Sequence, residues 1–148
     1  MSSTTTAQEL TVEDRAFLAG PRLGFLTVAS DTGIPEPRPV WFEATEDGAV
    51  QLFSFATSPK VRRVRRDPRA SLVAANALGE PEYWISISGT ASVEEDGGRE
   101  LAARLGPQYW DLDDPEKAAE LESMLAADLV RIVIRPERIN RYGGYRRR

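Results

Sequence analysis

Residues 54–73 read SFATSPKVRRVRRDPRASLV, and this stretch predicts a strand, a short helix and a second strand in succession. A hydroxyl side chain at position 57 or 58 suits the helix N-cap, and Pro59 suits the first helical position. The helix is expected to end at about Arg66, because Asp67-Pro68 stops it. Two valines three residues apart would form its buried side. The segment therefore places a helix on a sheet.

The start of this helix, Thr57-Ser58-Pro59-Lys60, has the composition of an anion site. A helix N-terminus offers free N–H groups and a partial positive charge, and two hydroxyls and an ammonium add to it. Lys60 is one of two lysines in a chain that has 17 arginines. The sequence supports two interpretations: a phosphate cradle, or a cap at Ser58 with a solvated Lys60.

Positive charge is concentrated in residues 60–69, which hold six cationic side chains and one carboxylate. The whole chain has a net charge of −4, so the remaining residues sum to −9. Such a run is either a solvated helix face or a groove for a polyanionic ligand. A nucleic acid is disfavoured as a partner, because the chain is acidic and no aromatic side chains are interleaved with the arginines.

Length and composition exclude several classes of protein. A chain of 148 residues, 41% of them hydrophobic, predicts one globular domain. The sequence has no cysteine and no histidine. Thiol catalysis, a Ser-His-Asp triad and a metal or haem iron bound by these residues are therefore excluded, and no metal site is expected. No apolar run suits a membrane span, and residues 1–10 do not resemble a signal peptide. We expect a cytoplasmic protein in which residues 1–10 are a disordered tail.

The hydrophobic pattern predicts a mainly β protein with flanking helices. Strands are expected over residues 24–30, 49–55, 70–75, 83–93 and 129–134, with a short strand possible at 138–142. Helices are expected over residues 12–19, 59–66, 99–105 and 115–127. Successive strands are joined mostly by short turns, which favours an antiparallel sheet.

Prolines alternate at positions 35, 37 and 39, just before Val40-Trp41-Phe42. Alternate residues of an antiparallel strand aim their N–H groups to the same side, and proline has no N–H group. This strand should therefore pair on one side only near residues 35–39. The free side either faces a ligand or a bulge, or protects a sheet edge against aggregation.

Taken together, three motifs resemble the pyridoxamine 5′-phosphate oxidase-like split-barrel proteins. They are Leu26-Thr-Val-Ala with Arg38-Pro-Val-Trp-Phe42, then Ser54 to Val73, then Tyr83 to Val93. The resemblance implies a six-stranded antiparallel split β-barrel that forms a single flavin-binding domain over residues 11–145. It also implies a homodimer with FMN or the deazaflavin F420 in clefts between the subunits.

The resemblance also assigns roles to individual residues. Arg38 and Lys60, with the hydroxyls of Thr57 and Ser58, would contact the cofactor phosphate. The backbone of Pro39, Val40 and Trp41 would line the ring, with Ser54 and Phe55 beside it. Arg65 and its neighbours Arg62, Arg63 and Arg66 would face the polyglutamate tail of F420, and this slightly favours F420 over FMN.

The implied function is hydride transfer between the cofactor and a small organic substrate. Pyridoxamine phosphate oxidation itself is disfavoured, because the Arg-x-His motif of those enzymes cannot be present. No general acid is assigned, and Tyr109 is a candidate only if the segment 99–127 folds over the cleft. The alternative is a non-catalytic protein that stores or senses a flavin or F420.

Overall fold

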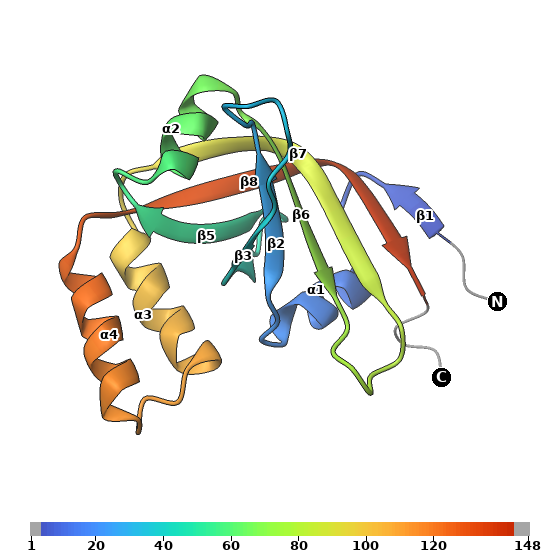
Figure 1. The fold of residues 1–148 in the computed structure, drawn as a ribbon. Coiled ribbons are helices and arrows are strands. Elements are labelled where there is room, and N and C mark those ends of the chain that lie inside the picture. Colours follow the sequence, from blue (N-terminus) through green and yellow to red (C-terminus); the bar gives the residue numbers. More distant parts are fainter. Residues whose placement is uncertain (1–3, 144–148) are drawn as a thin grey trace.

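Residues 4–143 fold into one curled antiparallel sheet with four helices around it (Figure 1). The computed structural model describes residues 4–143, with side chains from residue 7 onward. The strands are β1 (Thr4–Ala7), β2 (Gly24–Val28), β3 (Arg38–Val40), β4 (Glu43–Ala44), β5 (Val50–Phe55), β6 (Arg69–Ala75), β7 (Trp84–Glu94) and β8 (Leu129–Tyr142). The helices are α1 (Val12–Ala19), α2 (Pro59–Arg66), α3 (Gly98–Tyr109) and α4 (Pro115–Ala126).

The order across the sheet is β3-β2-β6-β7-β8-β5-β4, and β1 pairs with β8. Strand β8 is long enough to pair with β5 through its first half and with β1 through its last residues. A register shift lies between Ser88 and Gly89 of β7, beside Pro136 of β8. A Cβ atom on Gly89 would come within 2.0 Å of the Arg135 carbonyl oxygen, so only glycine permits this close approach. The bulge bends both long strands and curls the sheet.

The expected split-barrel class is confirmed, but in the described part of the chain the sheet has eight strands rather than six. The additions are β1 and the two-residue β4, which are too short and polar for a hydrophobic pattern to reveal. The expectation of a disordered tail over residues 1–10 is wrong for residues 4–7, because they pair with residues 139–142 of β8. Residues 1–3 and the end of the predicted domain, 144–145, lie outside the described residues.

The proline-rich segment forms the sheet edge that its pattern predicts. Strand β3 pairs with β2, where Pro39 lies opposite Phe25, and within residues 4–143 it has no second neighbour. The strand is shorter than expected, because only residues 38–40 join the ladder.

The helices agree closely with the sequence patterns. Thr11 and Asp14 form the capping box of α1, and the Ser58 side chain caps α2. Helix α3 passes its expected end at residue 105 and includes Pro107, which lies in the last turn. In Figure 1, α3 and α4 lie side by side at one end of the sheet. No helix within residues 4–143 has the length and apolar character needed to cross a membrane.

Candidate functional site

A cavity of about 350 Å³ lies where five parts of the chain meet. Its lining comprises Leu23, Pro39, Val40, Trp41, Phe53, Lys60 and Met124. Four of these residues, the segment 39–41 and Lys60, are expected cofactor contacts, and the fold brings them together. The walls are apolar, and Lys60 is the one ionisable side chain among the described residues that line the cavity.

Lys60 occupies an unfavourable position for an ammonium group. It is half-buried at the second position of α2, where the helix dipole is positive. Burial and the charge of nearby Arg38 both lower its pKa. Within residues 4–143 no carboxylate lies within ion-pair distance of the Lys60 ammonium group, whereas Arg38 is 3.6 Å from Glu36. The cavity therefore ends at an unneutralised cation.

Of the two hydroxyls expected at the phosphate cradle, that of Ser58 is already engaged in hydrogen bonds. The Ser58 hydroxyl accepts a hydrogen bond from the Val61 amide at 3.4 Å, as an N-cap does. It also lies 2.7 Å from the buried hydroxyl of Ser54. Thr57 and Phe55 are exposed, and none of these four residues lines the Lys60 cavity. Serines 54 and 58 thus fix the start of α2, and with it the position of Lys60.

Three of the α2 arginines converge on one carboxylate. Asp31, in the loop between β2 and β3, accepts hydrogen bonds from Arg62, Arg63 and Arg66 at 2.9–3.2 Å. Arg63 and Arg66 hold the pKa of Asp31 below its ordinary value, with the Arg63 hydrogen bond as the largest cause. Arg65 lies on another side of the helix and pairs with Glu95 at 3.3 Å. The arginines of α2 therefore do not form one continuous basic face. Arg65 lies apart from the three arginines that bind Asp31.

Aromatic side chains surround the cavity wall at Trp41. The Trp41 ring stacks on Tyr109, with centroids 5.1 Å apart, and meets Phe53 and Trp110 edge-on. The Tyr109 hydroxyl donates a hydrogen bond to the Arg22 carbonyl oxygen at 2.7 Å, and burial raises its pKa. Tyr109 thus supports Trp41 from behind, because it does not line the cavity itself.

The sequence patterns do not mark Leu23, Phe53 and Met124 as site residues. Phe53 belongs to an expected strand, but its pattern does not show which cavity the strand borders. Met124 comes from α4, whose docking depends on tertiary packing. Its presence in the lining shows that α4, within the segment 99–127, borders the cavity.

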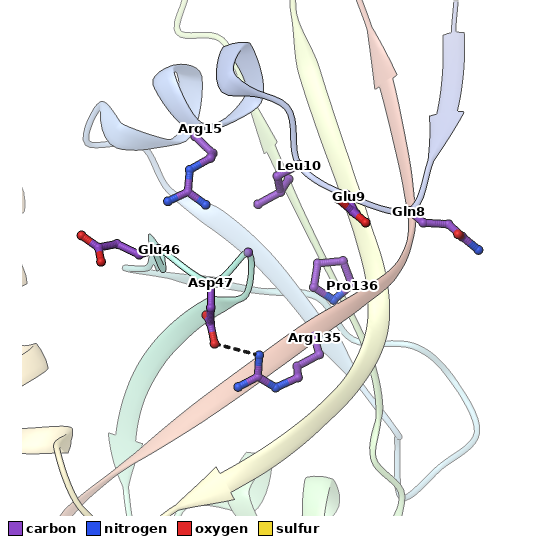
Figure 2. A pocket seen from close by; sticks show the side chains of 9 residues that line it. Gln8, Glu9, Leu10, Arg15, Glu46, Asp47, Arg135 and Pro136 are labelled. Carbon is purple, nitrogen blue, oxygen red and sulfur yellow. Dashed lines mark hydrogen bonds and ion pairs between the residues drawn. The ribbon is translucent and has the colours of Figure 1, made fainter.

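Figure 2 shows a second cavity, of about 520 Å³, that contains none of the expected site residues. Its lining comprises Gln8, Glu9, Leu10, Arg15, Glu46, Asp47, Gly48, Arg135 and Pro136. The Arg135 guanidinium pairs with Asp47 at 3.2 Å, and two further carboxylates lie around the opening. Acidic groups outnumber basic groups here, so this cavity suits an anionic ligand less well than the Lys60 cavity.

Solved structures of other proteins resemble this fold. A conserved hypothetical protein of Mycobacterium tuberculosis is 25% identical, with a TM-score of 0.66 over 95% of this chain and 89% of that protein. A protein described as an F420 reductase is 19% identical, with a TM-score of 0.65 over 84% of this chain and 94% of its own. A FAD-binding protein of Mesorhizobium loti is 19% identical, with a TM-score of 0.60 over 95% and 99% of the two chains.

The last two likenesses show a shared fold only. Among curated proteins, none matches this sequence. The sequence pattern of the family described as pyridoxamine 5′-phosphate oxidase matches residues 10–142, which span both the curled sheet and the Lys60 cavity. The chain therefore belongs to the pyridoxamine 5′-phosphate oxidase family.

Proposed function

We propose that the protein binds a flavin-type cofactor, with the cofactor phosphate at Lys60 and the ring against the apolar cavity wall. The observation that carries this proposal is the half-buried Lys60 ammonium, which lies at the positive end of a helix and faces an apolar cavity. Burial and the positive end of the helix dipole both disfavour a cation there. An anionic ligand better explains the position of Lys60.

The residues present fit such a cofactor. Lys60 supplies a cation for the phosphate, and Arg38 adds a second charge close by. Val40, Trp41 and Phe53 supply an apolar wall for a flat ring. A bound flavin or deazaflavin supplies the hydride chemistry, while the protein contributes position and electrostatic field.

F420 fits the charge around the cavity better than FMN does. The cations Lys60, Arg38, Arg62, Arg63 and Arg66 lie on α2 and the adjacent β3, beside the carboxylates of Asp31 and Glu36. This surface keeps an excess of positive charge beyond what one phosphate needs, and the polyglutamate tail of F420 would neutralise it. The folds of an F420 reductase and a FAD-binding protein support the cofactor class.

A homodimer completes this proposal. One row crosses the outer face of the sheet through Pro39, Phe25, Val73, Ser86 and Asn140, and it has no charge. Phe25, on β2 next to the edge strand β3, is 43% exposed on this face. A large exposed apolar side chain with uncharged neighbours on both sides is typical of protein interfaces. Pro39 also lines the Lys60 cavity, so a second copy on this face would border the cofactor.

A non-catalytic role in cofactor storage or sensing is the second candidate. It is favoured by the lining of the cavity, where no described side chain other than Lys60 can exchange a proton.

The two functions, oxidoreductase and storage or sensing, differ in whether the bound cofactor turns over. Protein loaded with reduced F420 or reduced FMN should be mixed with a panel of small quinones, enones and nitro compounds, and cofactor oxidation followed by absorbance. Oxidation faster than in free cofactor supports the oxidoreductase, whereas tight binding without acceleration supports storage or sensing.

A further inference from the structure

We propose that Asp31 determines which anionic ligands the α2 surface accepts, by occupying the arginines until a polyanion displaces it. The inference rests on the proposed function, because it concerns the surface next to the Lys60 cavity. Asp31 would select ligands that carry several anionic groups beyond one phosphate.

The first step is the geometry of the contact. One oxygen of Asp31 accepts hydrogen bonds from Arg62 and from two nitrogens of Arg63, and the other accepts one from Arg66 at 2.9 Å. The donors that would bind a ligand's carboxylates or phosphates are thus directed at a carboxylate of the protein itself. An anion that reaches these guanidinium groups must compete with Asp31 for them.

The second step is that the contact can be displaced. The Asp31 side chain is 38% exposed, and Arg62 and Arg66 are 59% and 49% exposed. Ion pairs in contact with water are weak and screened by salt. Asp31 also lies in an exposed loop between β2 and β3, so its release need not disturb the core. A ligand with two or more closely spaced anionic groups can therefore replace it.

The third step is continuity with the cavity. Arg63 lies one turn after Lys60 on α2, and Glu36 lies between Arg63 and Arg38, at 4.0 Å and 3.6 Å. The cations thus extend from the cavity to the Asp31 loop, about 9 Å along the helix axis from Lys60 to Arg66. A phosphate at Lys60 leaves Asp31 in place, whereas an anionic tail continuing along α2 meets it directly.

The test compares wild type, Asp31→Asn and the matched control Asp47→Asn by calorimetric titration at low ionic strength. Asp47 is also an exposed aspartate paired with an arginine, but it lies in the second cavity. The ligands are F420, FMN and a tetraglutamate peptide, which reports on the tail alone. We expect Asp31→Asn to bind tetraglutamate and F420 about fivefold to tenfold more tightly, because one competing charge is removed. FMN should bind unchanged, and Asp47→Asn should match wild type throughout.

Two results would contradict the proposed role of Asp31. If Asp31→Asn and Asp31→Ala bind tetraglutamate no more tightly than wild type does, or do not bind it, Asp31 does not compete for the arginines. An equal gain for FMN would show a general charge effect and would also overturn the proposal. Failure of the proposed function looks different: wild type then binds neither FMN nor F420, while the tetraglutamate comparison still decides the role of Asp31.

Discussion

The ring of Tyr109 stacks on the ring of Trp41, with planes only 8° apart, while its hydroxyl bonds to the backbone of Arg22. Helix α3 thereby supports one wall of the Lys60 cavity and joins it to the segment before β2. Tyr109 thus positions Trp41: its ring stacks on the Trp41 ring, and its hydroxyl holds Tyr109 in place.

Tyr109→Phe should keep the ring stack and lose the hydrogen bond to Arg22. We expect a loss of about 1 kcal/mol in the free energy of unfolding, which is typical of one hydrogen bond. Single-turnover reduction by the bound cofactor should be unchanged, because the hydroxyl does not line the cavity. Denaturant unfolding and stopped-flow absorbance measure the two effects. A tenfold slower reduction with unchanged stability would instead make Tyr109 an acid in the reaction.

Lys60→Gln should stabilise the protein while it weakens anion binding. The substitution removes a half-buried cation from the positive end of α2, for an expected gain of about 0.5 kcal/mol, or about 1–2 °C in Tm. The pKa of Lys60 is lowered, so its charge destabilises the fold below that pKa, and the cost fades as pH rises through it. The gain in Tm should therefore shrink at alkaline pH.

Lys117→Gln is the matched control, because Lys117 is the other lysine of the chain. Its ammonium lies 3.4 Å from Glu120 and 4.4 Å from the centre of the Trp110 ring. Removing this satisfied cation should not raise Tm at any pH. Equal gains in the two variants would show that Lys60 is an ordinary surface lysine.

Asp14→Asn should strongly destabilise the fold. Asp14 is fully buried and accepts hydrogen bonds from Tyr83 at 2.9 Å and from Arg141 at 2.8 Å. Burial alone would raise its pKa, but the hydrogen bonds from Arg141, Thr11 and Tyr83, together with the charge of Arg141, outweigh burial and lower it. Breaking a buried ion pair of this kind costs about 3 kcal/mol or more. Asp113→Asn, at an exposed aspartate, should cost little in the same unfolding experiment.

The same aspartate gives a pH dependence with a definite sign. Because the folded pKa of Asp14 lies below its ordinary value, its contribution is complete above about pH 4 and is lost as pH falls through the lowered pKa. Asp14→Asn should therefore flatten the decline in stability below pH 4. An unchanged acid slope would mean that other carboxylates control acid unfolding.

Phe25→Asp should prevent formation of the proposed homodimer. The new carboxylate would lie in the uncharged row on the sheet's outer face, where burial of an unpaired charge is costly. Sedimentation velocity should show a dimer for wild type and a monomer for the variant. Val12→Asp, at an apolar residue of α1 that is 80% exposed, is the control and should remain dimeric. A monomeric wild type would contradict the proposal outright.

Much of the site could be predicted from local sequence. The N-cap, the proline at the first turn and the two buried valines fix α2, and so they place Lys60 at its start. The pairing of Asp31 with three arginines could not be predicted, because Asp31 lies more than 30 residues away in a turn-like segment. Met124 was missed for the same reason: its place depends on how α4 docks, which periodicity does not specify.

The most direct test of the proposed function is a fluorescence titration of wild type and Lys60→Gln with F420 and, in parallel, with FMN. Wild type should bind F420 with a Kd below about 100 μM, more tightly than FMN. Lys60→Gln should weaken F420 binding at least about tenfold, because the phosphate loses its one half-buried cation. If wild type binds neither cofactor below that concentration, or if Lys60→Gln binds as tightly as wild type, the Lys60 cavity is not a cofactor site.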